Sequence, residues 1–476
     1  MNRISVVRSL FLILALTLLA GCGNGSSSDP SGNINLIFVV SPDLAYNAPG
    51  DVNPGTGNLT NQGLQRSLLM AAYLKQQVLG TSNVSAIYAI EPMTHLQTAH
   101  NYPDMAALES IQQFALLNQY TMVGTTAYSY PINSSYAPGS VPNGVALPDP
   151  YTPVCQGLDF NDAAGNNESL ATHIIEANVP GFYVFSAPWE TISTLMVGIN
   201  RTKGYNLNLP ATYMGPNYVY AISVTPSGGA SLVIYNSNLN PPSTYPVLPA
   251  PVASASCNTQ QAYFNITNRG IASSQIPGKA NTNETVYLIR HAEAHPTSTF
   301  EDGNYIGAGQ WRALALPSAL QGKISPEEVY SIDPAEGIPL TADLQVSYVR
   351  PSLTVQPYAI ANNLPCYLVA SFCIGGPTTS PTVARTTSDY FFAGGTFSDK
   401  TILVAWEHDH FPPLITALFA SYNITLGVQV PAVSWPTADY DTIWRVHLDN
   451  QGNVTVDNVL CEGIDSASLP AAPPQF

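Results

Sequence analysis

The sequence predicts an α/β fold that is built twice along the chain. Short runs of β-branched and aromatic residues alternate with stretches in which apolar residues recur every three or four positions. This alternation is typical of strands joined by helices around a mainly parallel sheet. The same succession occurs in the first half and again in the second, and two apolar runs of the second half end in clusters of charged residues. We therefore expect two α/β units.

Six segments of the first half recur in the second, in the same order and at an offset of about 220 to 250 residues. Such internal repetition indicates a duplicated supersecondary arrangement. The alternative is two unrelated α/β domains that share generic strand and helix patterns. The pairs are INLIFVVSPD and TVYLIRHAEA, GLQRSLLMAAYL and GQWRALALPSAL, AIYAIEP and EVYSIDP, SIQQFALLNQ and TVQPYAIANN, FYVFSAPWE and ILVAWEHDH, and NYVYAISV and DYDTIWRV.

The first 22 residues predict an export signal. Arg3 and Arg8 precede the apolar run LFLILALTLL, and small residues lead to Cys22. This ending resembles the lipobox of bacterial lipoproteins, which implies a lipid anchor on Cys22. Gly23 then implies the outer membrane of the cell envelope, facing the periplasm or the exterior. An ordinary cleavable signal with a chance cysteine is the alternative, and no other run is long and apolar enough to cross a bilayer.

Charge and length limit the remaining possibilities. Thirteen of the 15 Lys and Arg residues and all 31 Asp and Glu residues follow Cys22, so this part of the chain has a formal charge of −18. Such a negative charge argues against a nucleic-acid partner. The 476 residues, 45% of them hydrophobic, are enough for two domains. We expect a signal over 1–22, a flexible linker over 23–32, a first domain over 33–260 and a second over 261–476.

Polar residues follow two apolar runs of the second half, where an open α/β sheet binds its ligands. After TVYLI and TILVAW come Arg290, His291, Glu293, Glu407, His408, Asp409 and His410. Arg350 opens a probable helix between the two runs.

The motif LIRHAE, the later Arg350, the late histidine and the stretch GQWRALAL resemble the histidine phosphatase superfamily, with its phosphoglycerate-mutase-like fold. The resemblance implies two tandem three-layer α/β/α domains. It also implies that His291 is the nucleophile that attacks a phosphoryl group, while Arg290, Arg350 and His408 hold the phosphate oxygens. A neutral imidazole is nucleophilic near neutral pH, and guanidinium forks match phosphate oxygens.

A carboxylic acid must also protonate the leaving oxygen. Asp409, Glu407 and Glu293 are the candidates. The acid-phosphatase branch of the family places the donor directly after the late histidine, which implies Asp409, and Glu407 is the alternative. The mutase branch takes a glutamate from the stretch between the second arginine and the late histidine, and PCYLVASFCIGGPTTSPTVART supplies none.

The sequence departs from the family pattern at two positions. Ala292 stands where the family has glycine, and Ala294 stands where acid phosphatases place another arginine, although Pro296 matches. Both departures bear on turnover and substrate class.

The first half lacks the catalytic set. The alignment puts Val40, Ser41 and Asp43 at the places of Arg290, His291 and Glu293, with Ala106 at that of Arg350 and Pro188 at that of His408. We therefore expect a degenerate, catalytically dead copy. Other residues are expected to be structural: Trp311 and Trp406 in the core, Arg312 on a helix surface, His295 and His410 at the pocket rim or surface, and His95, His100 and His173 in ordinary loops or helices.

The five cysteines after Cys22 permit two disulfides of unassigned pairing, and their spacing predicts no metal site. These features together predict an envelope-anchored phosphomonoester hydrolase that acts on a small phosphorylated substrate through a phosphohistidine and needs no cofactor. The alternative is a non-catalytic anion-binding or scaffolding lipoprotein. The sequence predicts no oligomeric state.

Overall fold

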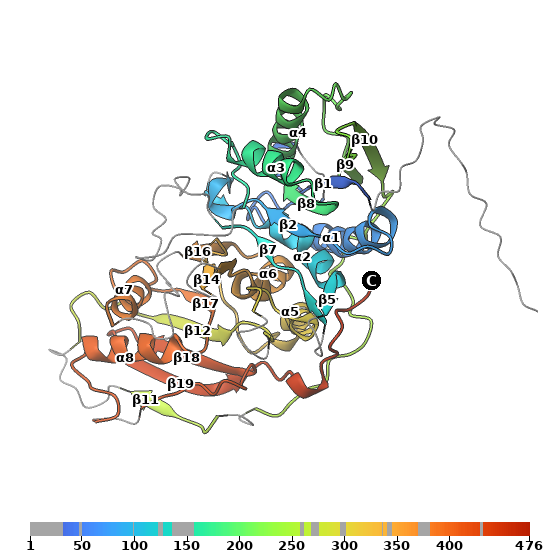
Figure 1. The fold of residues 1–476 in the computed structure, drawn as a ribbon. Coiled ribbons are helices and arrows are strands. Elements are labelled where there is room, and N and C mark those ends of the chain that lie inside the picture. Colours follow the sequence, from blue (N-terminus) through green and yellow to red (C-terminus); the bar gives the residue numbers. More distant parts are fainter. Residues whose placement is uncertain are drawn as a thin grey trace, which may run out of the picture.

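The computed structural model describes residues 32–46, 50–98, 100–121, 127–135, 157–257, 261–267, 276–295, 301–335, 337–339, 345–369, 381–428 and 432–476. Two large β-sheets follow one another along the chain, each with helices around it (Figure 1). The predicted export signal, Cys22 and the linker up to residue 31 lie outside the described residues. In the part of the chain that is described, no helix is both long enough and apolar enough to span a bilayer.

The first sheet has six strands in the order β10-β9-β1-β8-β2-β7. Its strands are β1 (Ile34–Val40), β2 (Ala86–Ala89), β7 (Ile132–Asn133), β8 (Gly181–Ala187), β9 (Tyr218–Val224) and β10 (Ala230–Asn236). Its helices are α1 (Asn61–Tyr73), α2 (Ala106–Leu117), α3 (Asn166–Ala177) and α4 (Trp189–Lys203). Short elements complete this half: β3 (Leu96–Gln97), β4 (Tyr102–Pro103), β5 (Gln119–Thr121), β6 (Ala127–Ser129), and the turns η2 (Leu44–Tyr46), η3 (Leu74–Val78) and η4 (Pro92–Thr94).

The second sheet has seven strands in the order β11-β19-β18-β12-β17-β13-β16. Its strands are β11 (Asn265–Thr267), β12 (Glu284–Arg290), β13 (Glu328–Ile332), β16 (Cys366–Val369), β17 (Thr401–Trp406), β18 (Thr442–Leu448) and β19 (Val454–Cys461). Its helices are α5 (Gly307–Ala319), α6 (Arg350–Asn362), α7 (Pro381–Phe392) and α8 (Phe411–Ser421). The small strands β14 (Gly337–Pro339) and β15 (Gln345–Ser347) and the turn η8 (Ser466–Ser468) complete it.

The two sheets share one strand order once β11 is set aside, and the pairing directions agree strand by strand. In each sheet four neighbouring strands pair in parallel and two edge strands pair antiparallel, as β1 does with β8 and β9, and β12 with β17 and β18. The six recurring sequence segments lie on these equivalent elements. A shared ancestry by duplication stays a prediction, because the same order can also arise independently.

Each sheet is covered by helices on both faces, because successive strand residues point to opposite sides. In β1, Ile37 and Val39 pack in the core shared with α1 and α2, whereas Leu36 and Phe38 pack with α3 and α4. In the second half α5 and α6 share one core with the sheet, and α7 and α8 share the other. The predicted α/β fold, with two tandem three-layer units, is confirmed.

The two halves pack through α1 and α2 of the first and α5 and α6 of the second (Figure 1). Two matched hydrogen bonds cross this interface. Gln112 Nε2 donates to Asn304 Oδ1 at 2.9 Å, and Gln356 Nε2 donates to Asn58 Oδ1 at 2.9 Å. Gln112 and Gln356 occupy equivalent positions on α2 and α6, so the contact has an approximate twofold symmetry like that of an isologous dimer.

One disulfide is present among the described residues, between Cys257 and Cys461. It ties the segment that leads into the second sheet to the end of β19. Cys366 is a buried free thiol on β16. Cys155 and Cys373 lie outside the described residues, so the pairing of a second bridge stays open.

Candidate active site

The site forms where β12 and β17 end side by side. The strands pair in parallel up to Arg290 and Trp406, and the His291 N–H then donates to the Trp406 carbonyl at 2.9 Å. The carboxyl ends of parallel neighbours lie at the same edge of a sheet. This arrangement brings His291 close to the residues that follow Trp406, as the sequence predicts.

His291 is oriented as a neutral nucleophile. Its Nδ1 lies 2.7 Å from the Ala292 carbonyl oxygen, which can only accept, so Nδ1 carries the proton and Nε2 keeps its lone pair. The side chain is buried, and burial followed by the nearby Arg350 and Arg290 lowers the pKa of His291 well below its ordinary value. A neutral imidazole at working pH is what nucleophilic attack requires.

Arg350 lies beside this nucleophile. It is the first residue of α6, where Pro351 suits the first turn of a helix, and its N–H donates to the Gly303 carbonyl at 3.0 Å. Arg350 Nε is 3.4 Å from His291 Nε2, Nη1 pairs with Glu301, and the guanidinium carbon lies 4.7 Å from the Tyr348 ring centroid. Burial lowers the pKa of Arg350, but Glu301 and its other partners outweigh burial and raise the pKa overall.

Arg290 is held by the segment before β18. Its Nη1 donates to the carbonyls of Thr437 and Asp439, its Nη2 lies 3.3 Å from the Tyr440 hydroxyl, and its guanidinium carbon lies 3.8 Å from the Tyr440 ring centroid. Its Nε is buried without a partner. The side chain is therefore fixed in the pocket while one donor is left for an anion.

His408 lies with Arg290 and Arg350 at the site. Its side chain is 7% exposed, its Nε2 lies 3.3 Å from Asp409 Oδ1, and its Nδ1 has no partner. Burial, with Arg290 and Arg350 adding to it, lowers the pKa of His408 to about 3. The imidazole is therefore neutral, and it can offer one N–H to an anion without carrying a charge.

The two carboxyl candidates next to His408 differ in exposure. The Asp409 side chain is 64% exposed, whereas that of Glu407 is 23% exposed and lies 3.5 Å from His410 Nδ1. Burial, Asp409 and Glu301 raise the pKa of Glu407, against the lowering effect of Arg350 and Arg290. Both carboxyls flank His408, that of Asp409 exposed and that of Glu407 partly buried.

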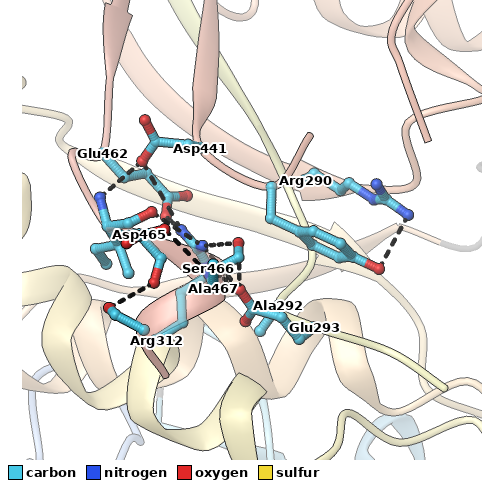
Figure 2. A network of polar contacts seen from close by, with 12 residues as sticks. Arg290, Ala292, Glu293, Arg312, Asp441, Glu462, Asp465, Ser466 and Ala467 are labelled. Atoms are coloured by element: carbon cyan, nitrogen blue, oxygen red, sulfur yellow. Dashed lines mark hydrogen bonds and ion pairs between the residues drawn. The ribbon is translucent and has the colours of Figure 1, made fainter. Parts of the chain in front are cut away.

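Glu293 belongs to a different network (Figure 2). Its Oε1 accepts from Arg312 Nε at 2.8 Å and from Ser466 Oγ at 2.9 Å, and Arg312 also pairs with Glu462. The expectation that Arg312 lies on a helix surface is wrong, since its side chain is 0% exposed. Glu293 therefore compensates a buried guanidinium.

The histidines that flank the two motifs are also buried. His295 Nε2 lies 2.9 Å from Asp302 Oδ1, and the His410 ring stacks on Trp406 with centroids 4.5 Å apart. Their predicted placement at the rim or surface is wrong, because both residues are buried. Trp406 and Trp311 are buried as predicted.

Ala292 replaces the family glycine without strain. Its φ is negative, its side chain is buried, and its N–H donates to Thr354 Oγ1 on α6 at 2.8 Å. An L residue is therefore accommodated at this strand end. Ala294 is half-buried and supplies no donor in place of the family arginine.

Sequence reasoning missed the partners that hold the arginines, namely Glu301, Tyr348 and Tyr440. Tyr348 lies two residues before Arg350, which was a usable signal. Glu301 and Tyr440 come from loops far from Arg350 and Arg290 in sequence, and neither loop carries a recognisable pattern.

The equivalent edge of the first sheet carries different chemistry. The Ser41 N–H donates to the Ala187 carbonyl at 2.9 Å, as His291 does to Trp406, so Val40, Ser41 and Asp43 are the counterparts of Arg290, His291 and Glu293. Since Ala187 is the counterpart of Trp406, Trp189 lies at the place of His408. The expectation that Pro188 lies there is wrong by one residue, because the sequence comparison slipped by one position in β8.

A scan against protein-family models and a search of curated proteins find no match for the chain. Solved structures that resemble part of it include phosphoglycerate mutase from Plasmodium falciparum (14% identity, 41% of this chain and 99% of that chain, TM-score 0.21). They also include phosphoserine phosphatase from Entamoeba histolytica (16%, 43% and 98%, 0.24) and a mycobacterial glucosyl-3-phosphoglycerate phosphatase (13%, 36% and 94%, 0.22). At such TM-scores these likenesses decide nothing about activity.

Proposed function

We propose that the second half is a phosphomonoester hydrolase of the histidine phosphatase type. The observation that carries this proposal is the tautomer of His291: Nδ1 is hydrogen-bonded to the Ala292 carbonyl, so Nε2 carries the lone pair and lies 3.4 Å from Arg350 Nε. Arg290 and His408 face the same pocket and add donors for phosphate oxygens. The LIRHAE resemblance assigns the same residues the same roles.

The reaction would proceed in two steps. His291 Nε2 attacks the phosphorus atom, the ester P–O bond breaks, and the leaving oxygen takes a proton from a carboxylic acid. Water then attacks the phosphohistidine, the carboxylate takes a proton from this water, and phosphate leaves with His291 restored. Arg350 and Arg290 stabilise the negative charge that spreads over the equatorial oxygens.

Asp409 is the proposed proton donor. In an in-line displacement the leaving oxygen lies opposite the attacking atom. The Asp409 side chain is 64% exposed, so its carboxyl can meet a leaving oxygen that departs from the buried His291 toward solvent. Glu407 is the second candidate, and its raised pKa favours it as an acid that keeps its proton.

The first half is proposed to position the phosphate-binding arginine. Gln112 of α2 holds Asn304, in the loop that carries Glu301 and Gly303, and Ser135 Oγ lies 2.8 Å from Ser347 Oγ, three residues before Arg350. Both segments that contact Arg350 are thereby fixed from the other copy. A copy that keeps its fold but lacks the nucleophile can retain this role.

The chain is further proposed to be a lipoprotein of the cell envelope, anchored through Cys22. The order of charged, apolar and small residues before Cys22 supports this proposal. Cys22→Ser in the full chain should move the protein from the membrane fraction to the soluble fraction and abolish labelling by a radioactive fatty acid. An unchanged distribution and label would contradict it.

Hydrolysis of a generic aryl phosphate tests the activity. His291→Ala should lower kcat/KM by at least about 1,000-fold, because the covalent route is lost. His173→Ala, on the exposed face of α3, is the matched control and should leave the rate unchanged. Equal rates in all three proteins would contradict the catalytic assignment.

Binding of inorganic phosphate without turnover would favour the alternative, a non-catalytic anion-binding lipoprotein. An acid-labile phosphoenzyme in the wild type would establish the covalent intermediate.

A further inference from the structure

The first copy carries a compact ligand set at the edge where the second copy has its phosphate pocket. Asp43, His95 and Asp104 each place a nitrogen or carboxylate oxygen so that all three atoms lie within 4.8 Å of one another. Asp43 follows β1, His95 follows η4, and Asp104 precedes α2. Three separate segments therefore converge on one point.

The three side chains are held in place from behind. Asp43 Oδ1 accepts from the Ala45 N–H at 2.6 Å, and Asp104 Oδ1 accepts from the Ala106 N–H at 3.0 Å. The His95 ring stacks on Phe160 with centroids 3.7 Å apart. Each carboxylate thus has one oxygen that accepts a hydrogen bond from a backbone N–H. In metal sites, hydrogen bonds of this kind orient the ligand side chains.

Two of the three ligand atoms already contact each other, because His95 Nε2 lies at a hydrogen-bond distance of 2.5 Å from Asp43 Oδ2. Asp104 is 0% exposed, and its Oδ2 is buried without a hydrogen-bond partner. The side chain of Gln97 lies close enough to lower the pKa of Asp104, although its Nε2 and Asp104 Oδ2 both lack a partner at full hydrogen-bond geometry. A buried carboxylate oxygen without a full hydrogen bond is costly unless something else compensates it.

No arginine or lysine compensates this cluster in the described part of the chain. The charged groups that act on His95 are Asp104, Asp43 and Glu190, all acidic. Glu190 lies two residues after Pro188 and one after Trp189, the counterpart of His408, so it corresponds to Asp409. Relative to the second copy, the first copy has lost the arginines of this sheet edge, with Val40 and Ala106 in their places, while Asp43 and Glu190 keep the carboxylates of Glu293 and Asp409.

We propose that Asp43, His95 and Asp104 bind a divalent transition-metal cation. One imidazole nitrogen and two carboxylate oxygens are the donors that Zn²⁺ and its first-row neighbours take, with water free to fill the fourth position. Ligand distances of about 2.0 to 2.2 Å require the His95 and Asp43 atoms to separate by about 0.8 Å, a small side-chain movement. The prediction that the chain has no metal site considered only the cysteines and histidine pairs.

Zn²⁺ titration of the chelator-treated full chain at pH 8 tests the proposal, since metal binding competes with protons. Calorimetry should show one site that Asp104→Asn and His95→Gln each weaken by at least about 10-fold. His408→Ala is the matched control, because Glu407, His408 and Asp409 also lie close enough to hold an ion. Binding that survives both first-copy substitutions, or that only His408→Ala removes, would overturn the proposal.

Thermal unfolding separates loss of binding from loss of folding. Asp104 is fully buried and its Oδ2 has no hydrogen-bond partner, so a neutral amide of the same shape should be tolerated there. Asp104→Asn without metal should therefore unfold at or above the wild-type temperature, while the rise that Zn²⁺ causes in the wild type disappears. If Asp104→Asn keeps that rise, or if the wild type shows none at saturating Zn²⁺, the site does not exist.

Discussion

Arg350 Nε lies 3.4 Å from His291 Nε2 in the buried pocket at the end of β12. The guanidinium therefore contacts the atom that would attack phosphorus, and it repels a proton from that atom. Arg350 thus has two effects, one on the charge of the nucleophile and one on the phosphate.

Arg350→Lys should lower kcat/KM by about 100-fold or more, because a single ammonium group replaces the guanidinium group that contacts both His291 and Glu301. Steady-state kinetics with an aryl phosphate measures this loss. Arg385→Lys, on the exposed face of α7, is the matched control for loss of a guanidinium. If the Arg350 variant kept wild-type kinetics, Arg350 would not be a phosphate ligand.

Activity should persist in acid below the ordinary histidine range. Burial and the two arginines keep the pKa of His291 well below its usual value, so the neutral form remains as the pH falls through 6.5. The profile of kcat/KM against pH should therefore show no acid limb near 6.5. A limb with a pKa near 6.5 that moves in Arg350→Lys would show that the histidine titrates normally.

The same buried histidines should destabilise the folded protein in acid. His291 and His408 have depressed folded pKa values, so the unfolded chain binds more protons below pH 6.5 and stability falls as the pH drops. Each contributes a slope of at most about 1.4 kcal/mol per pH unit below 6.5. Urea unfolding at several pH values should show a shallower slope in His408→Asn than in the wild type. An identical slope would mean that His408 is not held neutral.

Asp409→Asn and Glu407→Gln should separate the two possible proton donors. Loss of the donor should slow esters with poor leaving groups by about 100-fold or more and leave activated aryl esters much less affected. We expect this pattern for Asp409→Asn. If Glu407→Gln alone showed this pattern, Glu407 would be the proton donor.

Gln112→Ala and Gln356→Ala form a matched pair across the interface. Each removes one buried hydrogen bond of 2.9 Å, and each should cost about 1 kcal/mol of stability. Only Gln112 holds the loop that carries Glu301, so only Gln112→Ala should also raise KM. Equal kinetics in both variants would show that the first copy does not position Arg350.

Much of the site follows from local sequence. Parallel strands deliver the residues after them to one edge, so LIRHAE and WEHDH predict that His291 and His408 meet. The start of α6 at Arg350 follows from the proline after it and the apolar spacing beyond. The recurring segments also predict two α/β units, each with a mainly parallel sheet, because strand and helix runs alternate in the same succession in both halves.

The tertiary structure alone decided which groups surround these residues. Glu301 on Arg350, Tyr440 on Arg290 and the burial of Arg312 between Glu293 and Glu462 all join segments far apart in the chain. The pairing of Cys257 with Cys461 and the meeting of His95 with Asp43 and Asp104 are of the same kind. Local sequence determines strand, helix and face, because these depend on neighbours along the chain. Ionisation, charge compensation and ligand sets depend on neighbours in space, and these become defined only when the two copies and their loops pack.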